Sequence, residues 1–252
     1  MILAIDAGNT NVVFACFEGE TVVHTWRADT KTPVSAGSLH AGLEEAGVKA
    51  EAITGGILAS VVPGLNAPLE QAFRGVTEKD LIMVGADGVD PGIEVRVAAP
   101  DKVGADRLMN AVAGKHYYGA PVIVVDFGTA TTFDVVGADG AFEGGAICPG
   151  IRLSLKALHD ETAKLPLITL EKPEAVVGKD TEKAMKSGIF WGYVSLIEGM
   201  TARIRQELGG DAKTVATGGD AWLFAKHTDA IEDVRDDLTL QGLRLVYERN
   251  TR

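Results

Sequence analysis

The stretch PVIVVDFGTATTFDVV, residues 121–136, repeats the pattern of ILAIDAGNTNVVFACF, residues 2–17. Each begins with an unbroken apolar run typical of a buried strand, ends it at an aspartate followed closely by glycine, and continues into a second apolar run. Asp6 and Asp126 are 126 − 6 = 120 residues apart, nearly half of the 252-residue chain. We therefore predict a duplicated α/β protein. The alternative is that a common β-turn recurs by chance. Chance does not explain why a third strand is expected at the same place in each half.

The flanking sequence extends this repeat into two halves. In the first, apolar runs and turn residues predict strands near 2–6, 11–17, 21–28, 53–62 and 80–85, with helices over 34–47 and 66–75. In the second, three strands begin at 121 and are followed by a long helix over 179–208, a strand at 213–217 and two further helices, the last at 239–249. We expect two similar domains with mixed sheets, residues 1–116 and 117–252.

Composition excludes several classes of function. A formal net charge of −11 would repel a phosphate backbone, so we expect no nucleic-acid partner. No apolar run reaches the roughly 18 residues of a membrane helix, and the start of the sequence shows no secretory signal, so we expect no membrane association and a cytoplasmic location. Cys16 and Cys148 lack metal-ligand spacing and are predicted to be buried free thiols.

The two aspartate–glycine turns suit a nucleotide held through its phosphates. Glycine lets the backbone N–H groups approach a phosphate, and short polar side chains in both turns add donors. The carboxylates of Asp6 and Asp126 would repel a polyphosphate unless cations intervene, and Mg²⁺ is the usual one. Neither a P-loop nor a GxGxxG pattern is present. Gly218 and Gly219 would let a base or ribose lie close to the backbone, although a glycine pair alone is weak evidence for a nucleotide site.

A second polar segment, Gly104-Ala-Asp-Arg107, could hold the phosphate acceptor. Asp106 could take the proton of a substrate hydroxyl as general base, and Arg107 could bind a substrate carboxylate through its planar guanidinium. Helix capping is the alternative for Asp106, because apolar residues continue from it at helical spacing. His159 is more simply explained as a partly exposed helix residue and Thr181 as a first-turn residue, and the three tryptophans are expected to serve packing.

These motifs resemble the type III pantothenate kinase family. The resemblance rests on DAGNTN near the N-terminus, GADR at 104–107, VDFGTATTFD at 125–134, GGAICPGI at 144–151, TEKAMKSGIFWGY at 181–193 and LTLQGLRLVYERN at 238–250. It implies the duplicated ribonuclease-H-like fold of acetate and sugar kinases, chaperone ATPases and actin, in a homodimer. It also implies transfer of the ATP γ-phosphate to pantothenate, giving 4'-phosphopantothenate at the start of coenzyme A synthesis.

Matching the family's motifs assigns roles to individual residues. Asp106 would be the general base, Thr181 would reach pantothenate at the dimer contact, and Asp126 would sit at a monovalent cation site for K⁺ or NH₄⁺. Asp6 would hold the Mg²⁺ that accompanies ATP, through water. The pantothenate site would comprise Gly104, Ala105, Asp106, Arg107 and Thr181. The ATP site would comprise Asp6, Ala7, Gly8, Asn9, Thr10, Asn11, Val12, Val13, Thr129, Gly218 and Gly219.

One departure concerns the segment before GADR, where many members have Tyr after an Arg and this chain has Val97. Losing one neutral hydrogen bond would weaken substrate binding several-fold, at a cost of about 1 kcal/mol. Two other functions remain open: a non-catalytic, ATP-binding regulatory accessory protein of this fold, and a kinase or phosphatase of this fold with another acceptor. The GADR segment favours pantothenate kinase over both.

Overall fold

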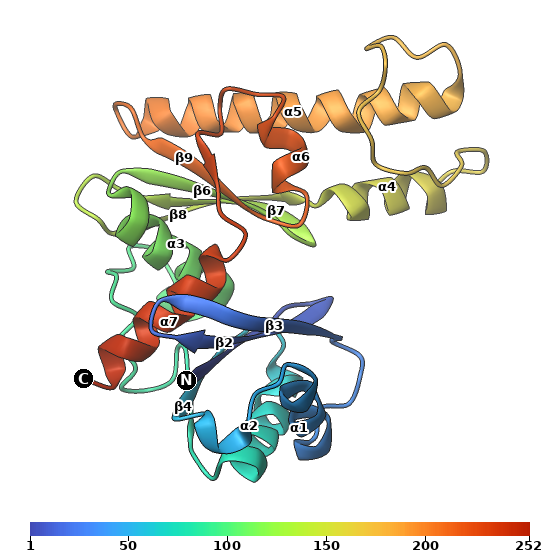
Figure 1. Cartoon of the computed structure of the whole chain (residues 1–252). Coiled ribbons are helices and arrows are strands. Elements are labelled where there is room, and N and C mark those ends of the chain that lie inside the picture. The colour runs from blue at the N-terminus through green and yellow to red at the C-terminus, as the bar shows by residue number, and fades with distance from the viewer. The chain divides into compact units, whose positions relative to one another are not determined.

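The computed structural model describes all 252 residues, which form two compact units (Figure 1). The first contains residues 1–117 and 237–252, and the second contains residues 118–236. The predicted division at 116/117 placed the last helix in the second half. In the structure that helix belongs to the first unit, because its apolar side packs against the first unit's strands.

The first unit is built on a mixed five-stranded sheet with strand order β3-β2-β1-β4-β5. Its first three strands form the predicted antiparallel meander, and β4 and β5 add in parallel beside β1. The strands are β1 (Ile2–Ala7), β2 (Asn11–Glu18), β3 (Thr21–Asp29), β4 (Gly55–Ser60) and β5 (Leu81–Met83). Because β1 is a central strand with a parallel neighbour, its side chains are largely buried, as its unbroken apolar sequence predicted.

Helices cover both faces of this sheet (Figure 1). The unit contains α1 (Ala36–Glu45), α2 (Pro63–Thr77), α3 (Ala105–Tyr118) and α7 (Leu238–Asn250), with 3₁₀ turns at Ala50–Ala52 and Pro100–Lys102. The core beneath α1 and α2 joins Leu3 and Ile5 of β1 to Leu43 and Phe73. On the other face α7 packs on β1 and β4. At Gly242 the helix α7 lies directly against α3, since a Cβ there would lie 2.1 Å from the Met109 carbonyl oxygen.

The second unit has a corresponding mixed sheet with order β10-β9-β6-β7-β8. The strands are β6 (Val122–Phe127), β7 (Ala130–Val136), β8 (Phe142–Pro149), β9 (Lys213–Gly218) and β10 (Asp233–Val234), and the helices are α4 (Ile151–Asp160), α5 (Thr181–Glu207) and α6 (Ala221–Ala225). Its core packs Val125 and Phe133 of the sheet against Phe190 of α5 and Phe224 of α6. The long α5 begins where Asp180 accepts the Lys183 N–H at 2.8 Å, an N-cap.

The two sheets share one topology, which confirms the predicted duplication and the ribonuclease-H-like fold. The order 3-2-1-4-5 of the first unit becomes 8-7-6-9-10 in the second, with the same parallel and antiparallel pairings. The first hairpin closes between Ala7 and Val12, with four residues between them, and the second between Phe127 and Thr131, with three. The second turn is therefore one residue shorter.

Two further features bear on the sequence predictions. The segment before GADR that contains Val97 has no regular strand and forms only an isolated bridge, at Val95. Cys16 is a buried free thiol, as predicted, whereas Cys148 is free but partly exposed, because it lies on the edge strand β8. No helix has the combination of length and apolar character needed to cross a membrane.

Candidate active site

The first turn, between β1 and β2, projects polar side chains from the end of the sheet. Gly8 donates its N–H to the Asn11 carbonyl at 3.0 Å, which closes the turn and leaves Asn9, Thr10 and Asn11 exposed. Thr30, just after β3, braces the turn: its hydroxyl donates to the Gly8 carbonyl at 2.7 Å, and its N–H to the Thr10 carbonyl at 3.0 Å. The turn is thus held by backbone contacts while its side chains face outward, as phosphate binding requires.

Asp106 lies in the first turn of α3, one residue after the helix begins at Ala105. It is therefore past the N-cap position, and the N-capping alternative in its simple form is wrong. Its Oδ1 accepts the Arg107 N–H at 2.8 Å, and this bond together with the positive Arg107 side chain lowers the pKa. Burial is the larger effect and raises the pKa of Asp106 above its ordinary value of 3.8. A carboxylate with a raised pKa suits proton abstraction.

The first unit places the GADR segment beside the strand that adjoins the first turn. Val61, directly after β4, donates its N–H to the Ala7 carbonyl at 3.0 Å. A Cβ on Gly104 would lie 2.6 Å from Asp106 Oδ1 and 3.5 Å from Val61 Cγ1, so a side chain there would displace the Asp106 carboxylate. The general-base candidate and the first phosphate turn, 100 residues apart in sequence (106 − 6), thus lie at one end of one sheet.

The second turn and the glycine pair lie together in the second unit. Gly128 donates its N–H to the Ala130 carbonyl at 3.0 Å, which leaves Thr129 exposed at the tip of the turn. Gly218, at the end of β9, is paired with Phe127 and has a φ of +92°. A Cβ there would lie 2.7 Å from Asp126 Oδ1. Gly218 thus preserves the space beside the Asp126 carboxylate, and Gly219 has open space around its Cα.

The duplicated topology gives these glycines a counterpart in the first unit. Ser60 pairs with Ala7 as Gly218 pairs with Phe127, so the Gly218-Gly219 turn corresponds to Ser60-Val61. In the first unit this position carries a valine that packs beside the GADR segment, and in the second it is bare backbone. The corresponding ends of β4 and β9 therefore differ in the space that they leave open.

Other candidates have simpler roles. His159 is exposed on α4 and its Nδ1 is 2.9 Å from the Leu165 carbonyl oxygen, a local contact consistent with the structural interpretation. Thr181 is the exposed first residue of α5. Of the tryptophans, Trp26 stacks on Phe14 at 4.9 Å, whereas Trp222 is 51% exposed, so its predicted packing role within one chain is wrong.

Sequence reasoning missed two residues that shape the turns. Thr30 follows the third predicted strand, and no local signal marks it as a contact that holds the first turn. Gly150 donates its N–H to the Thr129 carbonyl at 3.1 Å, and a Cβ there would lie 2.2 Å from that oxygen. Its place in the motif GGAICPGI was the available signal.

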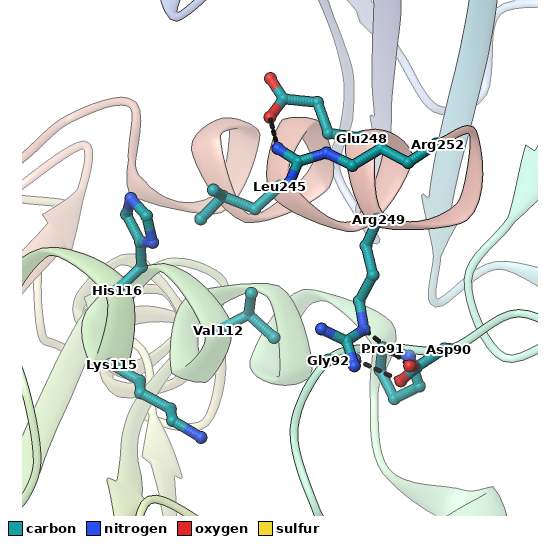
Figure 2. A pocket seen from close by; sticks show the side chains of 10 residues that line it. All are labelled: Asp90, Pro91, Gly92, Val112, Lys115, His116, Leu245, Glu248, Arg249 and Arg252. Carbon is teal, nitrogen blue, oxygen red and sulfur yellow. Dashed lines mark hydrogen bonds and ion pairs between the residues drawn. The ribbon is translucent and has the colours of Figure 1, made fainter.

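A cavity of about 680 Å³ lies elsewhere in the first unit, between the later turns of α3 and α7 (Figure 2). Lys115, at its edge, is nine residues along α3 from Asp106, about 13 Å at 1.5 Å per residue. Figure 2 shows its carboxylates already paired: Asp90 Oδ2 is 2.6 Å from Arg249 Nε, and Glu248 Oε2 is 3.5 Å from Arg252. None of the predicted site residues lines this cavity.

Comparisons with known proteins agree with the motifs. A family model described as type III pantothenate kinase matches residues 2–203. Type III pantothenate kinases of Paramagnetospirillum magneticum and Rhodospirillum rubrum are 49% and 47% identical to this chain; the alignments cover 100% and 99% of it, and 98% and 99% of those proteins.

Solved structures with lower identity share the fold. A Baf family protein from Campylobacter jejuni superposes with a TM-score of 0.64 at 19% identity, covering 98% of both chains. Component A of the (R)-2-hydroxyglutaryl-CoA dehydratase of Acidaminococcus fermentans superposes with a TM-score of 0.55 at 15% identity, covering 100% of this chain and 99% of that one. At these identities the likeness concerns the fold alone.

Proposed function

The chain belongs to the type III pantothenate kinase family and is a pantothenate kinase of coenzyme A biosynthesis, and we propose that Asp106 is the general base of its reaction. The observation that carries this proposal is the partly buried Asp106 carboxylate beside the strand that adjoins the first glycine turn. Burial raises its pKa, so the carboxylate accepts a proton more readily than an exposed aspartate would.

In this proposal the pantothenate hydroxyl attacks the γ-phosphorus of ATP and loses its proton to Asp106 Oδ2. The Oδ1 atom is held by the Arg107 N–H, which orients the carboxylate, and the Arg107 side chain attracts the carboxylate of pantothenate. Gly104, whose position a Cβ would fill, allows the substrate chain to approach Asp106. Val97 lies in irregular chain before this segment, where it supplies no polar contact to the substrate.

We assign ATP to the two glycine turns. The exposed Asn9, Thr10 and Asn11 would bind phosphate oxygens from the first unit, and Thr129 from the second. The open space at Gly219 would accept the adenosine, since neither Gly218 nor Gly219 has a side chain that could collide with a flat ring. Ala7, Gly8, Val12 and Val13 contribute backbone to the first turn.

The residues present fit the metal ions expected for this reaction. No group of three or more His, Cys, Asp or Glu side chains could enclose a metal ion. This fits Mg²⁺, which retains several waters and is held chiefly by substrate phosphates, with Asp6 reached through water. Bound in this way, Mg²⁺ neutralises the phosphate charge. Gly218 preserves the space beside Asp126 Oδ1, where we place the monovalent cation, K⁺ or NH₄⁺.

We also propose that the protein is a homodimer through its second unit. Large apolar side chains there are 50–70% exposed, and a surface of this kind marks an interaction site. They are Ile147, Leu153, Leu167, Val176, Val177 and Trp222. The edge strand β8 has a single charged residue, Glu143, so most of its outer edge is uncharged. Thr181 is exposed and thus available to a second copy. The cytoplasmic location stays a prediction.

The decisive experiment is an assay of purified protein with Mg²⁺-ATP, pantothenate and K⁺ or NH₄⁺, followed by detection of phosphopantothenate. We expect product, and expect Asp106→Asn to lower kcat by about a hundredfold or more. Near-normal turnover by Asp106→Asn would restrict Asp106 to a structural role. Binding of ATP without product under any cation would favour the regulatory accessory protein. Product from another alcohol but not from pantothenate would favour a kinase with a different acceptor.

A further inference from the structure

The backbone at the junction of β8 and α4 holds the Thr129 turn through a few close contacts. The Thr129 carbonyl accepts the Gly150 N–H at 3.1 Å, and a Cβ on Gly150 would lie 2.2 Å from the Thr129 oxygen and 2.6 Å from the Gly128 oxygen. The backbone of Gly150, where β8 passes into α4, therefore lies directly against the turn. Any movement of this junction moves the turn with it.

The junction is in turn held by one hydroxyl group of α5. Tyr193 Oη donates to the Pro149 carbonyl at 2.7 Å and is 2.7 Å from Ser154 Oγ. The phenol has one hydrogen, so when it donates to Pro149 the Ser154 hydroxyl donates to Tyr193. Ser154 also donates its N–H to the Gly150 carbonyl at 2.9 Å. The Tyr193 hydroxyl thus bonds on both sides of Gly150.

Burial and packing of Tyr193 restrict the movement of its hydroxyl, which bonds the Pro149 carbonyl. The residue is 7% exposed, and burial raises the pKa of its hydroxyl, which stays protonated and able to donate at neutral pH. Its ring is 6.2 Å from Phe224 of α6, which stacks on Phe127 of β6 at 5.5 Å. Phe127 directly precedes the Thr129 turn at Gly128, and Phe224 follows the Gly218-Gly219 turn. The Tyr193 ring therefore belongs to the packing beneath both turns.

We propose that Tyr193 is a positioning residue for ATP, which sets the Thr129 turn through Pro149 and Gly150 without touching the nucleotide. This inference rests on the proposed assignment of ATP to the turn. Loss of the hydroxyl removes this donor from the Pro149 carbonyl and lets the junction move, so the phosphate-binding backbone becomes less well preorganised. The GADR segment, with the proposed general base, is in the other unit and makes none of these contacts.

The test compares Tyr193→Phe with the unaltered protein by calorimetric titration with a Mg²⁺-bound, non-hydrolysable ATP analogue. We expect Kd to rise about three- to tenfold, the equivalent of one lost buried hydrogen bond, while the KM for pantothenate changes less than about twofold. Tyr118→Phe is the matched control. It removes a hydroxyl that bonds Asp233 at 2.7 Å on β10, the opposite edge of the same sheet from β8. Analogue binding by Tyr118→Phe should remain normal.

A second measurement needs no ligand. Amide hydrogen exchange over residues 144–154 should be faster in Tyr193→Phe than in Tyr118→Phe, with the largest change at Gly150 and Ser154. Normal analogue binding by Tyr193→Phe, or equal weakening in both variants, would overturn the inference. Failure of the unaltered protein to bind the analogue would refute the proposed function, and this inference with it.

Discussion

Replacing Gly218 with alanine should damage both the fold and the nucleotide site, because two separate costs coincide there. The φ of +92° is unfavourable for any residue with a Cβ, which costs about 1–2 kcal/mol. The added Cβ would lie 2.6 Å from the Phe127 carbonyl oxygen and 2.7 Å from Asp126 Oδ1. Since the first contact is with backbone, the sheet must shift, at a further cost of about 1–3 kcal/mol.

Gly219→Ala provides the matched comparison. Gly219 has nothing within 4 Å of an added Cβ and has no positive φ, so its replacement should change the free energy of unfolding by less than about 0.5 kcal/mol. Its methyl group would nevertheless enter the space that we assign to adenosine. We therefore expect Gly218→Ala to lose about 3 kcal/mol of stability, and Gly219→Ala to keep its stability but bind ATP more weakly.

Urea denaturation and ATP titration separate these effects. A loss of about 3 kcal/mol corresponds to a melting temperature lower by roughly 6–12 °C for a chain of this size. In Gly218→Ala the displaced Asp126 carboxylate should also weaken the stimulation of activity by K⁺ or NH₄⁺. If Gly218→Ala were as stable as the unaltered protein, or if Gly219→Ala were the less stable of the two, Gly218 would not have the role assigned to it, which is to preserve the space beside the Asp126 carboxylate.

Three further predictions follow from the contacts. Because burial raises the pKa of Asp106, kcat/KM should rise with pH through a value above 3.8. For the same reason Asp106→Asn should be at least as stable as the unaltered protein at pH 7, and this difference in stability should disappear below pH 4. The opposite stability order would contradict a raised pKa. Arg244 is 1% exposed and bonds Tyr117 and Glu248, so Arg244→Met should cost about 3 kcal/mol in urea denaturation, and a cost below 1 kcal/mol would show that the network is weak. Asp180→Ala should cost about 1 kcal/mol and Asp180→Ser much less, and equal costs would refute the capping role.

The local pattern of the chain determined most of the secondary structure and one half of the topology. Apolar runs that end in turn residues predicted β1, β2 and β3 and their counterparts β6, β7 and β8, because neighbouring antiparallel strands need only a short turn between them. The repeated aspartate–glycine turn predicted the duplication. The same turns and the GADR motif identified the candidate residues, since glycine, short polar side chains and a carboxylate stand close together in the sequence of each motif.

The tertiary structure alone decided which distant segments meet. The position of α7 on β1 and β4 depends on contacts between segments at least 238 − 60 = 178 residues apart, which no local periodicity encodes. The closeness of Gly104 and Val61, the brace from Thr30 and the clamp from Tyr193 through Pro149 to Gly150 are of the same kind. A local pattern reports what a residue prefers beside its sequence neighbours, whereas burial and hydrogen-bond partners depend on long-range packing. That packing partly buries the first-turn residue Asp106 and thereby raises the pKa of its carboxylate.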